Sequence, residues 1–124
     1  MVLIIGGAYQ GKLDFAKSAF GLSESDVFTY TGGEIDFSRR CIDRIEEFTL
    51  WCVQSGVDAV AFFQSHREQW QDSMLICEAI YAGVVIMGAD LRAWRQMHGL
   101  LWRYLSGEAA RVSRLFCGLE ERLK

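Results

Sequence analysis

Apolar positions along the chain follow two different periods, and together they predict alternating strands and helices. Short runs of apolar and β-branched residues are typical of buried strands, and they occur at 2–5, 27–30, 58–63, 73–77 and 113–117. Longer segments carry apolar residues three and four positions apart, the spacing of an amphipathic helix, and they span 13–20, 36–55 and 90–110. The polar segment 64–72 indicates a short helix or loop, and 118–124 is expected to be a short tail.

This alternation predicts one α/β domain over residues 1–124. Strands joined through helices run parallel, so we expect a mainly parallel sheet of about five strands with helices on both faces. Ligands bind such sheets at the carboxyl ends of the strands. The segments expected at that edge are 6–12, 31–34, 64–67, 77–78 and 117–118.

Composition limits the classes of protein to consider. Hydrophobic residues make up 51% of the chain, which excludes a disordered protein. The net charge of -3 gives no indication of nucleic-acid binding, and no apolar run approaches the ~20 residues of a membrane span. The first strand begins at Val2, which leaves no room for a signal peptide. The four widely spaced cysteines, interpreted as buried thiols, favour a cytoplasmic protein.

The loop after the first predicted strand has the composition of a phosphate-binding loop. Gly6 and Gly11-Lys12 fit the pattern Gly, four residues, Gly-Lys-Ser/Thr, and only its last position, Leu13, departs from it. Glycines let successive backbone N–H groups face one anion, and the helix that follows adds its positive end. We therefore expect nucleotide phosphates to bind at Gly6, Gly7, Ala8, Tyr9, Gln10, Gly11, Lys12 and Leu13. The alternative is a tight turn at Gly6-Gly7 followed by a solvated Lys12.

The metal part of such a site is incomplete in this sequence. Leu13 has no oxygen that could bind Mg²⁺, and we assign no residue as a direct metal ligand. A carboxylate at the end of a neighbouring strand is needed instead. Glu78 is the candidate catalytic acid and Glu34 the second choice, although either could be a solvated loop residue. Asp14 follows Leu13, but the next residue on a helix points about 100° away.

Histidine and tryptophan side chains give further expectations. His66 is expected at the ligand edge, with a plain surface histidine as the simpler interpretation. His98 is expected to be a helix-surface or packing residue. Trp94 belongs to the core side of the last helix, whereas Trp102 lies off its apolar stripe and could mark a subunit contact.

Two segments, which together cover about half of the chain, carry the motifs of a known family. The first is Leu3-Ile-Ile-Gly-Gly-Ala-Tyr-Gln-Gly-Lys12; the second contains Gly83-Val-Val, Arg92-Ala-Trp-Arg95, Gly99, Val112-Ser-Arg-Leu-Phe-Cys-Gly118 and Leu123-Lys124. In both, the chain resembles the adenosylcobinamide kinase/adenosylcobinamide-phosphate guanylyltransferases of cobalamin assembly. The resemblance implies a P-loop NTPase-like fold, bound ATP or GTP with Mg²⁺, phosphoryl transfer to the aminopropanol hydroxyl of adenosylcobinamide, and a homo-oligomer.

The chain departs from the family's pattern where metal or covalent chemistry takes place. The family's serine after the loop lysine is Leu13 here, its aspartate after the helix arginine is Gln96, and its acidic residue before the Gly-Ile-Val-Pro turn falls near Ala79, beside Glu78. His66 does not match the place of the histidine that becomes guanylylated. The resemblance therefore implies nucleotide binding more than catalysis. A catalytically degenerate regulatory subunit and a structural oligomer with an empty loop are the alternatives.

Overall fold

The fold is an α/β sheet covered by helices, seen in a computed structural model that describes residues 1–7, 10–80 and 88–124, with 88 and 89 described by their backbone. The strands are β1 (Val2–Gly6), β2 (Val27–Thr29), β3 (Cys41–Asp43), β4 (Met74–Glu78), β5 (Arg111–Phe116) and β6 (Leu119–Arg122). The helices are α1 (Lys12–Phe20), the 3₁₀ turn η1 (Glu24–Asp26), α2 (Ile45–Ser55), α3 (Ala59–Ser65), α4 (Arg67–Trp70) and α5 (Gly88–Glu108).

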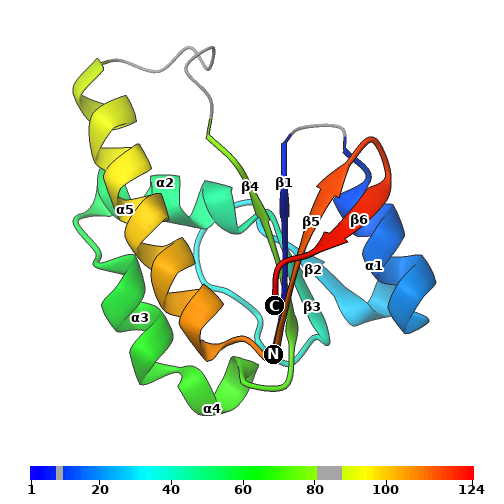
Figure 1. Ribbon diagram of the computed structural model, residues 1–124. Coiled ribbons are helices and arrows are strands. Elements are labelled where there is room, and N and C mark those ends of the chain that lie inside the picture. Colours follow the sequence, from blue (N-terminus) through cyan, green and yellow to red (C-terminus); the bar gives the residue numbers. More distant parts are fainter. Residues whose placement is uncertain (8–9, 81–87) are drawn as a thin grey trace.

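The strands form one mostly parallel sheet in the order β2-β3-β4-β1-β5-β6. Every pair is parallel except β5 and β6, which are antiparallel. Helix α1 lies on one face of the sheet, and α2, α3 and α5 lie on the other (Figure 1). Neighbouring residues of a strand therefore pack into different layers: Leu3 joins the cluster under α2, α3 and α5, and Ile4 joins the cluster under α1.

The order of the strands places a topological switch point between β1 and β4. The chain leaves β1 through α1 towards β2, and it leaves β4 through α5 towards β5, so the two connections diverge to opposite faces (Figure 1). The last residues of the two strands, Gly6 and Glu78, are register partners. Divergence of this kind opens a site at the carboxyl edge of a parallel sheet.

The predicted fold class is confirmed as an α/β sheet with helices on both faces, but the sheet has six strands rather than about five. The expected tail 118–124 is wrong, because Leu119–Arg122 forms β6. Cys117 and Gly118 connect β5 to β6 with φ angles of 50° and 77°. Two consecutive positive φ angles are what a tight hairpin turn requires, and glycine adopts them readily. The other predicted elements, apart from the two regions below, agree within two residues.

The predicted helix 36–55 is wrong in its first half. Residues Cys41–Asp43 form the interior strand β3, and α2 begins only at Ile45. Cys41 and Ile42 are both fully buried, one in each layer, which is the pattern of a strand covered on both faces. Arg44, with a φ of 64°, separates strand from helix. The helical spacing of apolar residues across β3 and α2 led to the prediction of one helix where the structure has a strand and a helix.

The predicted strand 58–63 is also wrong, because residues Ala59–Ser65 form helix α3. The Asp58 carboxylate accepts hydrogen bonds from the N–H groups of Val60 and Ala61, at 3.0 and 3.2 Å, and so caps the helix. The two fully buried residues, Ala59 and Phe63, are four positions apart, as a helix requires. Residues 64–67 therefore do not follow a strand, and the expectation that they lie at the ligand edge of the sheet is wrong.

Two further expectations concern cysteines and membranes. Cys41, Cys52 and Cys77 are buried thiols as predicted, but Cys117 is exposed in the hairpin turn. The sequence did not predict the β5–β6 hairpin, so it did not predict that Cys117 lies in an exposed turn. Of the helices that the structure describes, none has the length and apolar character needed to cross a membrane.

Candidate functional site

A pocket of about 220 Å³ lies at the carboxyl edge of the sheet, where β3 and β4 end and α1 and α2 begin. We call it the edge pocket, and it is defined by its lining residues, Gly11, Lys12, Leu13, Asp14, Asp43, Arg44, Glu46 and Glu78. Two bear cationic side chains and four bear carboxyl groups. The pocket brings together the lysine and the acid that the sequence singled out, from elements 66 positions apart.

Lys12 is held in the pocket rather than solvated. Its side chain is only 10% exposed, and its Nζ donates a hydrogen bond to the carbonyl oxygen of Gly7 at 2.6 Å. The same Nζ lies 3.5 Å from Glu78 Oε1. The ammonium group is thus folded back over the loop that links β1 to α1. This geometry contradicts the structural alternative in which Lys12 is a free residue of the first helical turn.

The start of α1 is open to the pocket. Gly11 precedes the helix with a φ of 81° and offers no side-chain cap. The first N–H groups of a helix have no partner within it, and here they border a pocket. Leu13 also lines the pocket, while its side chain packs against the apolar cluster beneath α1. Helix N–H groups and Lys12 can therefore receive an anion, but the position of the usual hydroxyl is apolar.

The remaining loop residues have structural ties of their own. A Cβ at Gly6 would lie 2.8 Å from the carbonyl oxygen of Leu115, so the close approach of β1 and β5 requires glycine there. Gln10 joins the loop to the hairpin turn: its carbonyl accepts from the Gly118 N–H at 3.2 Å, and its side-chain oxygen accepts from the Cys117 N–H. Ala8 and Tyr9 of the predicted loop lie outside the described residues.

Two acids of the pocket, Asp43 and Glu46, were not identified from the sequence. The false helix 36–55 placed both within a helix, whereas the structure places Asp43 at the end of β3 and Glu46 in the first turn of α2. Glu46 is 5% exposed, and burial raises its pKa from 4.5 to about 7, with the nearby carboxylates of Glu78 and Asp43 adding to the shift. Burial also raises the pKa of Asp43. The signal available was an acid directly after a buried isoleucine, Asp43 after Ile42 and Glu46 after Ile45.

A chain of buried hydrogen bonds fixes the end of β4. Glu46 Oε1 accepts from the Glu78 N–H at 3.0 Å, and His98 Nε2 lies 2.9 Å from the Glu78 carbonyl oxygen. Because a carbonyl only accepts, Nε2 carries the proton, and the unprotonated Nδ1 lies 3.0 Å from Thr49 Oγ1, which itself donates to the Glu46 carbonyl oxygen at 2.9 Å. Trp94 Nε1 donates to the Glu46 carbonyl oxygen at 2.9 Å. Helices α2 and α5 thus hold the backbone of Glu78, α2 through its N–H group and α5 through its carbonyl oxygen.

This chain assigns His98 a packing role, as expected, and confirms Trp94 as a core residue that is 4% exposed. Burial lowers the pKa of His98 to about 4, so the ring is neutral at physiological pH. His66, in contrast, ends α3 and stacks on Phe62 with ring centroids 4.2 Å apart. It does not line the edge pocket, and Glu34 is exposed outside it.

The acidic lining bears on how an anion would bind. Lys12 and Arg44 supply two positive charges against the carboxylates of the pocket, so a polyphosphate meets repulsion unless a cation accompanies it. Within residues 1–7, 10–80 and 88–124, no three histidine, cysteine or carboxylate side chains are grouped as ligands of a metal ion. A cation here would therefore share its coordination with phosphate oxygens, as Mg²⁺ does in phosphate-bearing sites.

Two hollows adjoin the edge pocket. One, of about 400 Å³, shares Arg44 with it and contains Thr31, Gly32 and Trp51, so the predicted segment 31–34 reaches the neighbourhood of the site in part. The other, of about 520 Å³, lies between the loop after β1, α5 and the β5–β6 hairpin. We call it the hairpin groove; its lining includes Gly6, Gly7, Gln10, Trp102, Arg114 and Phe116.

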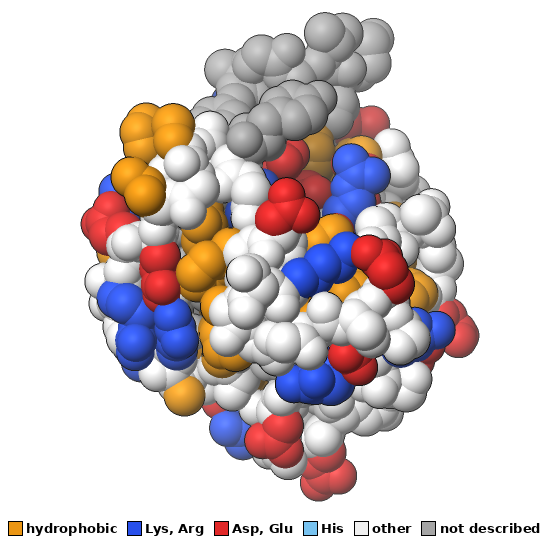
Figure 2. Space-filling model, turned by 90° about the vertical axis from the view of Figure 1, so that its right-hand side faces the viewer, with side chains coloured by type: hydrophobic (Ala, Val, Ile, Leu, Met, Phe, Trp, Pro, Cys, Tyr) orange, Lys and Arg blue, Asp and Glu red, His pale blue; other side chains and the backbone are white. Residues whose placement is uncertain are grey.

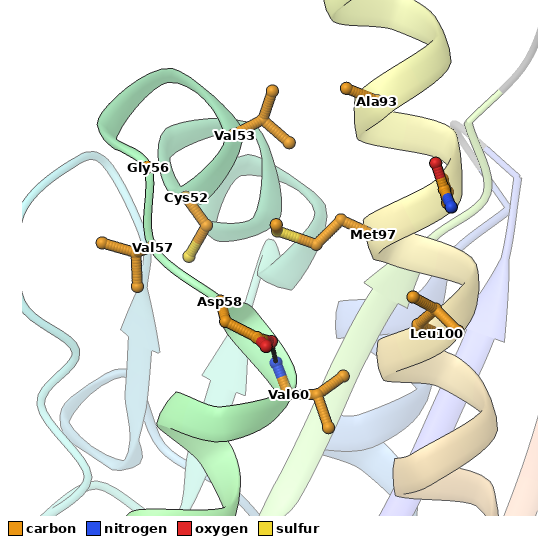
Figure 3. A pocket seen from close by; sticks show the side chains of 10 residues that line it. Cys52, Val53, Gly56, Val57, Asp58, Val60, Ala93, Met97 and Leu100 are labelled. Carbon is orange, nitrogen blue, oxygen red and sulfur yellow. Dashed lines mark hydrogen bonds between the residues drawn. The ribbon is translucent and has the colours of Figure 1, made fainter.

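A further hollow of about 460 Å³ lies between α2, the start of α3 and α5 (Figure 3). Its walls are apolar, with Met97 pointing from α5 towards Cys52 of α2 (Figure 3). The one carboxylate in it, Asp58, is bonded to the N–H of Val60 as the cap of α3. We call it the helix groove, and its lining offers no group for acid–base or phosphate chemistry.

The side of the molecule that carries α1 and the β5–β6 hairpin is mixed in charge. In Figure 2, lysine, arginine and acidic side chains are interspersed over the described part of this face, and no broad basic patch gathers there. Four ion pairs of this kind join Lys17 to Glu24, Arg40 to Asp26, Arg111 to Glu120 and Arg114 to Glu121. This face therefore gives no support to nucleic-acid binding.

Comparisons with known proteins add no name to this site. No model of a protein family matches the chain, and a search of curated proteins finds no match to it.

Proposed function

We propose that this protein binds a nucleoside triphosphate, ATP or GTP, with its phosphates in the edge pocket, and that the fold is a P-loop-like one. The observation that carries the proposal is the placement of Lys12. A lysine side chain that is 10% exposed, with its Nζ 2.6 Å from a loop carbonyl, borders a pocket that also exposes the start of a helix. Phosphate recognition combines these two features, helix N–H groups and one lysine.

The position of the pocket supports the same proposal. It is lined by the ends of β3 and β4 and the start of α1, next to the point between β1 and β4 where the chain connections diverge, and nucleotides bind near such points in parallel sheets. Gly11 gives the loop its left-handed turn into α1, and Gly6 lets β1 approach β5. The conformational need for glycine at these two positions supports the proposal.

The carboxylates fit a bound Mg²⁺ that accompanies the nucleotide. Asp43 and Glu78 end neighbouring strands, and both line the pocket with Lys12. They would hold the cation together with phosphate oxygens. The cation would neutralise part of the negative charge of the phosphates, which the four carboxyl groups of the pocket repel. Leu13 contributes no ligand to it.

Phosphoryl transfer is a second candidate function, and Glu46 is the observation that favours it. A buried carboxyl group with a pKa of about 7 lies in the same pocket as Lys12, and an acid tuned close to neutral pH suits proton removal from an acceptor hydroxyl. Adenosylcobinamide is the acceptor that the family resemblance suggests, and it stays a prediction. Homo-oligomer formation is likewise a prediction from that resemblance.

Calorimetric titration tests nucleotide binding. We expect ATP or GTP with Mg²⁺ to bind wild-type protein saturably and Lys12→Ala to lose binding at least tenfold. Lys17→Ala is the matched control, because it removes a lysine from the same helix whose Nζ pairs with Glu24 outside the pocket. No binding at millimolar nucleotide, or equal loss in both variants, would contradict the proposal.

Transfer is tested separately. If Glu46 accepts the acceptor's proton, Glu46→Gln retains nucleotide affinity but loses transfer of the γ-phosphoryl group to adenosylcobinamide. Binding without transfer in wild-type protein would leave the alternative of a nucleotide-binding subunit that has lost catalysis.

A further inference from the structure

The edge pocket is too small for a whole nucleotide. Its volume of about 220 Å³ lies below the roughly 300–1,000 Å³ of pockets that enclose small-molecule ligands. Among the described residues, its lining is mainly charged and offers no aromatic side chain, which suits phosphates and not a base. On the proposed function, the nucleoside must therefore extend into a neighbouring hollow.

The hairpin groove is continuous with the loop that would hold the phosphates. Gly6, Gly7 and Gln10 belong to its wall, and the next residues of the same loop, Gly11 and Lys12, line the edge pocket. The two hollows therefore meet at consecutive residues of the chain, Gln10 and Gly11. The other neighbour, the hollow around Trp51, shares only Arg44 with the edge pocket.

The groove has the side chains that bind a flat ring. The half-buried indole of Trp102 and the ring of Phe116, which is 69% exposed, come from α5 and β5 respectively. Arg114, also on β5, lines the groove, and its guanidinium is paired with Glu121 at 2.6 Å. Aromatic rings and a guanidinium are the surfaces on which nucleobases stack.

The groove is also anchored to the site. Trp102 packs beside the His98 ring, with centroids 5.1 Å apart, and His98 is bonded to the Glu78 carbonyl. On the opposite wall, Gln10 ties the loop to Cys117 and Gly118, which follow Phe116. Both aromatic walls are therefore held in a fixed relation to the loop between the two hollows.

From these observations we infer that the hairpin groove is the base subsite of the nucleotide site: it receives the purine ring of ATP or GTP between Trp102 and Phe116. The inference rests on the proposed function and deepens it, since it assigns the nucleoside half of the ligand. It also accounts for the 69% exposed ring of Phe116 beside the glycine-containing loop.

The test compares ATP and GTP with inorganic tripolyphosphate, which has the phosphates and no base. Calorimetric titration with Mg²⁺ is carried out on wild type, Trp102→Phe, Trp102→Leu and Phe116→Ala. Loss of stacking is expected to weaken nucleotide binding about five- to a hundredfold in Trp102→Leu and Phe116→Ala, with Trp102→Phe intermediate. Tripolyphosphate binding is expected to stay unchanged in all three, whereas Lys12→Ala weakens both ligands.

Leu119→Ala is the matched control for Phe116→Ala. Leu119 is the cross-strand partner of Phe116 and is 72% exposed, but it is outside the groove lining, so its removal should leave nucleotide affinity unchanged. The exposed position of Phe116 also keeps the test valid if Trp102→Leu does not fold.

The outcomes separate the two proposals. If wild-type protein binds nucleotide no more tightly than tripolyphosphate, if Phe116→Ala and Trp102→Phe both bind nucleotide like wild type, or if only Trp51→Phe weakens it, the base subsite is wrong while phosphate binding stands. If neither nucleotide nor tripolyphosphate binds, the proposed function fails and the subsite fails with it.

Discussion

Glu46 makes a quantitative prediction about stability. Its carboxyl group is 5% exposed, and its pKa rises from 4.5 to about 7 on folding, with burial as the main cause. A shift of this size corresponds to about 3 kcal/mol. Below pH 4.5 the group is protonated in both states and contributes no difference. As the pH rises to 7 the unfolded chain ionises first, so the native state loses up to that amount and stays at the lower value above pH 7.

Glu46→Gln removes the ionisation and keeps an oxygen that can accept from the Glu78 N–H. The variant should equal wild type in free energy of unfolding at pH 4 and exceed it by up to about 3 kcal/mol at pH 8. Urea titrations at half-unit pH intervals measure this difference. Glu47→Gln is the control, because it makes the same chemical change one residue along α2.

Burial does not raise the pKa of Glu46 if Glu46→Gln is equal to or less stable than wild type at pH 8. The same holds if the gain in free energy of unfolding over wild type is as large at pH 4 as at pH 8. Either result would mean that Glu46 is stabilised as a carboxylate, for instance by Arg44, whose Nε lies 4.0 Å from Glu46 Oε2. A matching gain in Glu47→Gln would instead assign the effect to the overall charge of the helix.

Three further predictions follow from buried or exposed single groups. Burial lowers the pKa of His98 from 6.5 to about 4, so the native protein loses about 3 kcal/mol of stability as the pH falls through this window. His98→Gln should lack that loss in the same urea titrations. A free energy of unfolding that falls with pH as steeply in the variant as in wild type would contradict the buried neutral ring. Asp58→Ala should cost about 1 kcal/mol by removing the cap of α3, against no comparable loss for the exposed Asp72→Ala; equal losses would contradict the cap. A thiol reagent should label Cys117 alone in native protein and all four cysteines in urea, and fast labelling of a second native thiol would disprove the burial of the other three.

The acid and the histidine of the buried chain act in opposite directions between pH 4.5 and 6.5. Rising pH costs native stability through Glu46 and restores it through His98. The wild-type profile should therefore be flatter than that of Glu46→Gln, in which only the histidine contribution remains. Glu46 contacts the N–H group of Glu78, and His98 contacts its carbonyl oxygen. The two opposing contributions to stability therefore both arise at the candidate site.

The sequence predicted the parts of the fold in which local pattern and tertiary role agree. The apolar run at Val2 is a fully covered strand, and the glycine at each end of its loop has a conformational reason, so β1, the loop and α1 were predictable. Lys12 and Glu78 were singled out before their contact was known. The start of α1 and the end of β4 were therefore the predictable part of the site, whereas the end of β3 and the start of α2 supply its other residues.

The middle of the chain misled because short apolar segments do not specify their own geometry. Cys41 and Ile42 fit a helical spacing with Ile45 and Phe48, and only burial on both faces of a sheet identifies them as β3. The run after Asp58 is equally ambiguous, and the cap that makes it α3 is a side-chain bond. Asp43 and Glu46 were hidden by the first of these errors, since an acid becomes part of a site only when its strand ends there.

The central claim is that phosphate is bound at the start of α1, and amide chemical shifts test it most directly. Uniformly ¹⁵N-labelled protein is titrated with ATP or GTP in the presence of Mg²⁺. We predict saturable shifts for the N–H groups of Gly11, Lys12 and Leu13, with a smaller shift at Glu78, and their loss in Lys12→Ala. Unchanged amides at millimolar nucleotide, or shifts confined to the helix groove around Met97, would contradict the account.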